Sequence, residues 1–157
     1  KISPSHQEKL NNAVQSSYDV EGIELQWINV EEALNAKTKV ELGNENLFRV
    51  EKAGVRIGYA DLGEAPSMKN VFDYVVLFNP DLSIKKSKVL IYREDYGRQI
   101  GSQRWLKQFI GKKSGDTITY GEDVDAISGA TISAKSMTVA VNAVLSTVEV
   151  LKKAEIL

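Results

Sequence analysis

The alternation of hydrophobic and polar positions predicts helices towards both ends of the chain and strands between them. Residues 3–17 are typical of a short helix in which Ser3 is the N-cap and Pro4 takes the first helical position. In residues 23–30 apolar and polar side chains alternate, which predicts a half-buried strand. Residues 30–40 follow with a pattern that indicates a second helix.

The middle of the chain predicts two hairpins. Residues 47–62 contain two alternating runs joined by Ala53-Gly54, a pair suited to a tight turn. Residues 71–78 and 84–92 repeat this plan around an Asn-Pro-Asp turn. Because the first of these two runs ends in four consecutive apolar residues, we expect it to be a central strand covered on both faces.

The C-terminal part of the chain returns to a helical period. Residues 101–113 carry apolar side chains at helical spacing, and we expect Trp105 and Phe109 in the core rather than against a ligand. Residues 116–121 indicate a short strand, and apolar positions at intervals of three and four predict a long packed helix over 132–153. The predicted fold class is α+β, with a mixed or antiparallel sheet flanked by helices.

The length of 157 residues is most simply that of one domain. We expect a helix and strand region over residues 1–46 and the core over residues 47–157. A chain of this size can bury roughly two thirds of the surface that its unfolded form exposes. It can therefore form a stable hydrophobic core without disulfides or structural metals.

Composition excludes several classes of function. The net charge of −1 argues against a nucleic-acid partner, and the absence of cysteine excludes thiolate catalysis and Cys-based metal sites. The only histidine, His6, lies near the start and is expected to be a solvated side chain, so a His-based metal site is not predicted. No run of 18 apolar residues predicts a transmembrane segment. The chain starts at Lys1, which we interpret as a processed start.

The segment Asp-Ala-Ile-Ser-Gly-Ala-Thr over residues 125–131 leads directly into the long C-terminal helix. On local grounds Ser128 or Thr131 could cap this helix, and Gly129 could provide a turn with positive φ. Alternatively, the free amides of residues 131–134 and the helix dipole could bind a phosphate, which small neighbouring residues would allow to approach. Both interpretations remain open at this stage.

This segment resembles the flavinylation motif of the FMN-binding domain family. The family includes the C subunit of sodium-translocating NADH:quinone oxidoreductase and the G subunit of the Rnf complex. In the family, a flavin transferase links FMN through its phosphate to the threonine hydroxyl that ends the motif. The resemblance implies covalent FMN on Thr131. It also implies a cofactor site made by the neighbouring residues of the motif, which are Asp125, Ser128, Gly129, Ala130, Ile132 and Ser133.

A second segment, residues 89–112, resembles the family's strand, glycine loop and aromatic helix. The resemblance as a whole covers about residues 47–150 and implies that Glu94, Tyr96 and Gly97 bracket the flavin ring, with Arg98 near the phosphate or ring. Otherwise Glu94 is a solvated loop charge and Arg98 a surface ion pair. The respiratory subunits carry Glu-Thr-Pro-Gly-Leu-Gly here, so the Glu-Asp-Tyr-Gly loop is closer to stand-alone or regulatory members.

Basic residues outnumber acidic ones by nine to three between positions 81 and 113. The excess could form an ordinary solvated face. It could also be a docking surface that attracts an acidic partner.

By resemblance, the protein is an extracytoplasmic bacterial electron carrier rather than an enzyme. Its expected partners are the flavin transferase and a membrane redox complex or other electron-transfer proteins, with anchorage through a segment not in this chain. A second hypothesis is a sensory or binding module that holds FMN or another phosphate ligand without a covalent bond. A third is a hydrolase that uses Ser128, Thr131 or Ser133 with Lys135.

Overall fold

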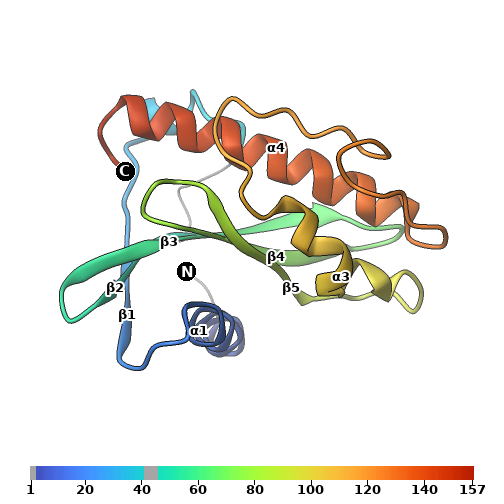
Figure 1. Ribbon diagram of the computed structural model, residues 1–157, viewed down its shortest axis with the longest axis horizontal. Helices are drawn as coiled ribbons and strands as arrows, with labels where there is room; N and C mark the ends of the chain where they lie inside the picture. Colours follow the sequence, from blue (N-terminus) through green and yellow to red (C-terminus); the bar gives the residue numbers. More distant parts are fainter. Residues whose placement is uncertain (1–2, 41–45) are drawn as a thin grey trace.

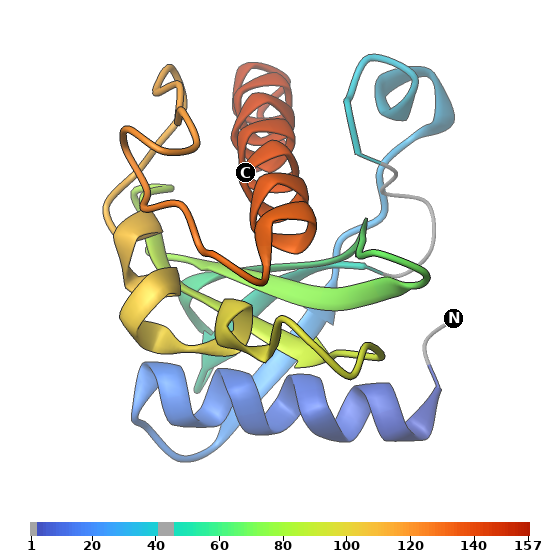
Figure 2. The ribbon, with the colours of Figure 1, turned by 90° about the vertical axis from the view of Figure 1, so that its right-hand side faces the viewer.

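The computed structural model describes residues 3–40 and 46–157, which form a five-stranded sheet between two helical layers. The strands lie in sequence order, and every pairing is antiparallel. Figure 1 shows the sheet with its labels, and Figure 2 shows the long helix α4 on one face and α1 on the other. The strands are β1 (Ile23–Trp27), β2 (Leu47–Lys52), β3 (Val55–Pro66), β4 (Val71–Phe78) and β5 (Ile84–Ile91). This arrangement confirms the predicted α+β class.

Helix α1 (Pro4–Tyr18) confirms the first predicted helix. The Ser3 hydroxyl accepts a hydrogen bond from the His6 amide at 3.2 Å, which satisfies one of the free donors at the helix start. Leu10, Ala13 and Val14 are buried against the sheet. The helix therefore closes one face of the sheet through a single apolar stripe.

Strand β4 lies between β3 and β5 and is buried along nearly its whole length, as its continuous apolar run predicts. Tyr74, Val76 and Phe78 belong to the core beneath α4, whereas Val75 and Leu77 belong to the core beneath α1. Because side chains alternate between the faces of a strand, one sequence run supplies both layers.

The β2–β3 hairpin turns on Ala53 and Gly54, whose φ angles are 50° and 78°. Two consecutive positive φ angles match the twist of the flanking strands, so the predicted tight turn is confirmed.

Helix α4 (Thr131–Lys153) confirms the predicted long helix and lies across the sheet. Its buried stripe includes Met137, Val141, Val144 and Leu145. Among the described residues, α4 is also the helix with sufficient length and hydropathy to cross a membrane, and 56% of that stretch is buried inside the protein. The same apolar composition is what a core helix needs to cover a sheet.

Two predicted helices are much shorter in the structure. Helix α2 (Glu32–Asn35) is one turn because it has no side-chain cap and the Thr38 hydroxyl donates to the Asn35 carbonyl oxygen at 2.7 Å just beyond its end. The predicted helix over 101–113 is instead three short pieces, η1 (Arg98–Gly101), α3 (Gln103–Leu106) and η2 (Lys107–Phe109). Trp105 and Phe109 are nevertheless buried together, with ring centroids 5.3 Å apart, which confirms their predicted place in the core.

The strand predicted over residues 116–121 does not form, and only an isolated bridge joins Tyr120 to Val124. A side chain of α4 takes the place of a neighbouring strand. The Ile118 amide donates to Asn142 Oδ1 at 3.0 Å, and Asn142 Nδ2 donates to the Ile118 carbonyl at 2.9 Å. These two bonds satisfy the main chain without a sheet.

His6 is not the solvated side chain that its position predicts. Its Nε2 lies 2.5 Å from Oδ2 of Asp73, a buried residue of β4. Arg93 contacts the same carboxylate, with its two terminal nitrogens 3.0 and 3.3 Å from the two oxygens. This network joins α1 to the strands near the pocket described next.

Candidate functional site

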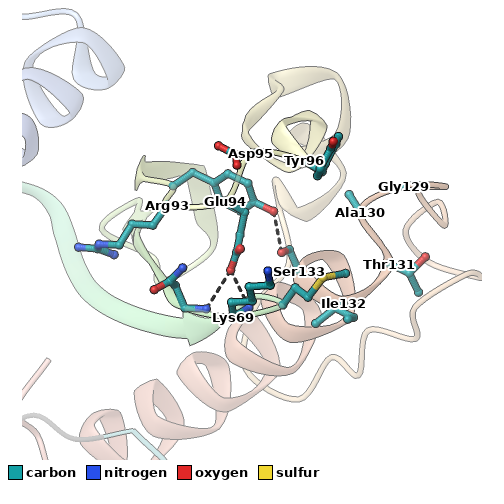
Figure 3. Close-up of a pocket in the computed structure, with 13 residues that line it drawn as sticks. Lys69, Arg93, Glu94, Asp95, Tyr96, Gly129, Ala130, Thr131, Ile132 and Ser133 are labelled. Carbon is teal, nitrogen blue, oxygen red and sulfur yellow. Dashed lines mark hydrogen bonds between the residues drawn. The ribbon is translucent and has the colours of Figure 1, made fainter.

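A pocket of about 500 Å³ opens where three segments meet. The segments are the turn between β3 and β4, the loop after β5, and the start of α4, as Figure 3 shows. The residues that line it are Met68, Lys69, Asn70, Tyr92, Arg93, Glu94, Asp95, Tyr96, Gly129, Ala130, Thr131, Ile132 and Ser133.

The start of α4 carries no side-chain cap. Ala130 occupies the N-cap position, and the preceding turn depends on Gly129, whose φ is 83°. The Thr131 hydroxyl instead donates to the Ile127 carbonyl at 3.2 Å. The prediction that Ser128 or Thr131 caps the helix is therefore wrong, whereas the predicted positive φ at Gly129 is confirmed.

Three amides at the start of α4 are open to a ligand. The first helical hydrogen bond in this turn runs from the Ala134 amide to the Ala130 carbonyl at 2.9 Å. The amides of Thr131, Ile132 and Ser133 have no acceptor within the part of the chain that the structure describes. Together with the dipole of a long helix, they favour a negative charge beside the exposed Thr131 hydroxyl.

Ser133 turns its hydroxyl towards the loop after β5. It is 3% exposed, and its Oγ lies 2.9 Å from the Tyr92 hydroxyl. Tyr92 in turn packs against Phe72 of β4, with ring centroids 5.9 Å apart. The first turn of α4 is thereby fixed to the sheet at the floor of the pocket.

Glu94 closes the wall of the pocket opposite α4. Its Oε2 accepts hydrogen bonds from the Ser67 hydroxyl at 2.6 Å and from the Lys69 and Asn70 amides at 2.8 Å each. The Ser67 bond is the largest of the contributions that lower the pKa of Glu94 below its usual value, and the amide bonds add to it. We call this arrangement the Glu94 clamp. It differs from the solvated charge that is one interpretation of the sequence.

Replacing Glu94 with glutamine is expected to loosen the turn over residues 67–70, because a neutral amide oxygen accepts these bonds more weakly than a carboxylate. The protection of the Lys69 and Asn70 amides against hydrogen exchange should fall by about tenfold.

Because the folded pKa of Glu94 is lowered, the clamp is complete above the ordinary glutamate pKa and is lost as the pH falls through the lowered one. Protection should therefore decline in acid in the native protein and stay flat in the variant. Glu122→Gln, at an exposed site, is the control, and equal protection in all three proteins would contradict the clamp.

Gly97 packs the loop after β5 against the motif before α4. A Cβ placed on it would lie 2.7 Å from the Tyr92 hydroxyl oxygen and 3.3 Å from both Ala130 Cβ and the Gly129 carbonyl oxygen. The main chain at Gly97 thus comes close to Tyr92, Ala130 and Gly129. Gly97 is not among the pocket-lining residues, and its predicted place beside the flavin ring stays a prediction.

The rim of the pocket is apolar on three sides. Tyr96 is 84% exposed, Met68 69% and Ile132 48%, and each comes from a different segment. Exposed large apolar side chains around one opening mark a surface that binds a ligand or partner.

Several predicted site residues lie outside the pocket lining. Arg98 and Ser128 are exposed. Asp125 is also exposed, and its main chain is held in place, with its carbonyl accepting from Trp105 Nε1 at 2.7 Å and its amide donating to Gln108 Oε1 at 3.0 Å. Their predicted roles towards a cofactor stay predictions.

Sequence reasoning missed part of the lining, namely Met68, Lys69, Asn70, Tyr92, Arg93 and Asp95. Arg93 and Asp95 adjoin Glu94, and Tyr92 ends a predicted strand just before it, so their position was an available signal. Met68, Lys69 and Asn70 had no such signal, because they lie between two predicted strands and away from every residue singled out. The hydroxyls of the motif have no histidine beside them among the described residues, and Lys135 lies over the Tyr120 ring at 5.9 Å. This geometry does not support the hydrolase hypothesis.

The described residues contain no cluster of acidic or histidine side chains suited to a metal ion. What they do contain is an uncapped helix start, an exposed hydroxyl and a pocket with an apolar rim. These features fit a ligand that has an anionic group for the helix N-terminus and an apolar body for the adjoining pocket.

Residues 69–146 match the family model of the FMN-binding domain, and the chain belongs to that family. The matched range runs from Lys69, on one wall of the pocket, through Thr131 to the middle of α4. The pocket thus lies almost entirely within the family domain, and the resemblance seen in the sequence is confirmed.

The solved structure of NqrC from Shewanella oneidensis has the same fold. Its TM-score is 0.63 at 17% sequence identity, over 87% of this chain and 90% of that one. No curated protein matches this chain by sequence. At this level of identity the likeness concerns the fold, including the sheet and the C-terminal helix.

Proposed function

We propose that this protein is an electron-carrying flavoprotein in which FMN is joined by a phosphoester to the Thr131 hydroxyl oxygen. Membership of the FMN-binding domain family supports the cofactor. The observation that carries the covalent site is the exposed Thr131 hydroxyl at an uncapped helix start that opens into the pocket.

The residues present fit both ends of FMN. The free amides of residues 131–133 provide donors for the phosphate, and the helix dipole favours its negative charge. Met68, Tyr96 and Ile132 provide apolar contact for the ring. In the attachment step, Thr131 Oγ would bond the phosphorus of a flavin phosphate activated as a phosphoanhydride. The anhydride P–O bond would break, and the second phosphate would leave with the bonding electrons and take up the hydroxyl proton.

The flavin, when bound, supplies the redox chemistry, and the protein holds and orients it. The pocket is open and its rim exposed, so a tethered ring would remain within reach of a redox partner. We therefore propose a carrier rather than an enzyme.

The proposed location is extracytoplasmic, with a flavin transferase for maturation and a membrane redox complex or other electron-transfer proteins as partners. The family resemblance supports these proposals. A tether also has a physical advantage there, because it makes the cofactor's binding effectively intramolecular where a lost flavin could not be recaptured.

The test is the intact mass of protein co-expressed with a matching flavin transferase. We expect a gain of one FMN less one water in the native chain and in Thr117→Ala, since Thr117 is exposed and lies outside both the motif and the pocket lining. Thr131→Ala should show no gain. Each variant removes one threonine hydroxyl, so the pair distinguishes the attachment site from a general effect of losing a hydroxyl.

An unmodified mass with a demonstrably active transferase would contradict the covalent site. Flavin that then remains with native protein and Thr131→Ala alike, and leaves both on denaturation, would support the non-covalent binding module.

A further inference from the structure

A strip of exposed basic and apolar residues runs beside the pocket on the segment that contains η1, α3 and η2. It consists of Tyr96, Arg98, Arg104, Lys107 and Ile110, and we call it the basic strip. Between Tyr96 and Lys113 the sequence contains no acidic residue. This segment therefore carries a net positive charge in a chain whose net charge is −1.

The cations of the basic strip are unpaired within the described residues. Arg98, Arg104 and Lys107 take part in none of the ion pairs found there, in contrast to Arg49 and Arg93, which each contact a carboxylate within 3.0 Å. Unpaired surface charges leave their field directed into solvent, where it can act on an approaching partner.

The orientation of the strip follows from what lies beneath it. Trp105, Leu106 and Phe109 are buried in the core. The neighbouring residues Arg104 and Lys107, three positions apart, are exposed. Gln103 Nε2 donates to the Ser87 carbonyl of β5 at 2.9 Å and fixes the segment to the sheet. The charges therefore stand on a rigid support.

The strip is continuous with the cofactor site. Tyr96 belongs to both, since it lines the pocket and is 84% exposed. Trp105 Nε1 donates to the Asp125 carbonyl, and Gln108 Oε1 accepts from the Asp125 amide, which joins the segment to the motif before Thr131. A protein seated on the strip would therefore reach the edge of the pocket at Tyr96.

We propose that the basic strip docks an acidic electron-transfer protein, with Tyr96 and Ile110 as its apolar contacts. This inference rests on the proposed function, because docking there matters only if the pocket holds a redox group. Complementary charge mainly raises the rate of encounter, and aromatic and arginine side chains are enriched at such interfaces. Each reduced flavin gives one electron to each of two one-electron acceptor molecules and releases two protons.

The test uses protein whose flavin load has been established by mass. Reduced protein is mixed with one of three oxidised acceptors, and flavin reoxidation is followed by stopped flow. The acceptors are cytochrome b5, an acidic haem protein, cytochrome c, a basic one, and a small neutral quinone. The variant is Arg104→Glu with Lys107→Glu, and the matched control is Lys9→Glu with Lys37→Glu, two exposed lysines outside the strip with the same change in net charge.

At low ionic strength we expect the strip variant to lower the rate with cytochrome b5 by about tenfold, and the control to change it by less than about twofold. The difference should disappear near ~0.5 M salt, where the screening length is only a few ångströms. The rate with cytochrome c should not fall, and the quinone should react equally with all three proteins.

Equal slowing in the strip variant and the control would overturn the inference, because net charge rather than position would then explain the rates. Unchanged rates combined with binding to anionic lipid vesicles that the variant loses would also overturn it, in favour of a membrane. A chain that gains no flavin would instead overturn the proposed function and this inference with it. The intact mass shows whether flavin is attached, and the reaction with quinone shows whether the flavin is redox-active without protein docking.

Discussion

Replacing Asp61 with asparagine is expected to stabilise the protein by about 4 kcal/mol at pH 8 and by little at pH 4. Asp61 lies in β3, pairs with Val76 of β4 and is 2% exposed. Burial raises the pKa of its carboxyl to about 7, from an ordinary value of 3.8. No hydrogen-bond donor among the described residues offsets this effect.

The sign follows from the direction of the pKa change. The folded protein holds the Asp61 proton more tightly than the unfolded chain, so stability is greatest below the ordinary pKa and falls as the pH rises from about 4 to about 7. Above that range the carboxylate is charged in an apolar setting, and the full cost is present. Asparagine keeps the shape and removes the titration.

Urea unfolding at several pH values between 4 and 8 measures this effect. Between pH 4 and pH 8 the free energy of unfolding of the native protein should fall by roughly 4 kcal/mol relative to that of Asp61→Asn. An equal pH dependence in the two proteins would contradict the prediction. Asp73→Asn is the matched control, because that buried carboxylate contacts His6 and Arg93. Its replacement should destabilise the protein instead, since His6 and Arg93 lose a charged partner and one of the two acceptor oxygens becomes an NH2 donor.

Replacing Gly97 with alanine is expected to destabilise the protein by about 3 kcal/mol and to impair flavin attachment. The φ of Gly97 is 84°, which costs a residue with a side chain about 1–2 kcal/mol. The added methyl group would also overlap the Tyr92 hydroxyl and press on Ala130 and the Gly129 carbonyl, and such crowding costs about 1–3 kcal/mol more. Relief requires the loop to move away from the start of α4.

Gly121→Ala separates the cost of the positive φ from the cost of crowding by the added methyl group. Gly121 has a φ of 87°, but a Cβ there would meet no atom within 4 Å, so only the backbone term applies. We expect this control to lose about 1 kcal/mol and to accept flavin normally. If both variants unfold at the same urea concentration and load equally, the close packing at Gly97 has no role in the site.

The sequence predicts those parts of the fold that depend on local pattern. Alternation and a turn with two positive φ angles specify the β2–β3 hairpin, and apolar spacing specifies α4. The same pattern misleads at residues 116–121, where Asn142 supplies the hydrogen bonds of a strand from a distant helix. No local signal encodes that substitution, because the partner is 24 residues away.

The candidate site likewise contains one part that the sequence predicts and another that it does not. Thr131 and the small residues before it can be recognised from the motif alone, and the structure places the hydroxyl at an open helix start. The Glu94 clamp could not be foreseen, because it joins Glu94 to Ser67, Lys69 and Asn70 across two strands. The opposite wall of the pocket is built from contacts of this long-range kind.

Because the pocket is built from three segments, we expect it to form late in folding. The strands pair with their sequence neighbours, so the sheet can form by local steps as the chain emerges. The start of α4 follows more than thirty residues after β5, and it must dock on the sheet before Ser133 can meet Tyr92. The proposed attachment of a cofactor needs all three segments and would therefore follow the completion of the fold, so that only molecules folded to their last helix would carry it.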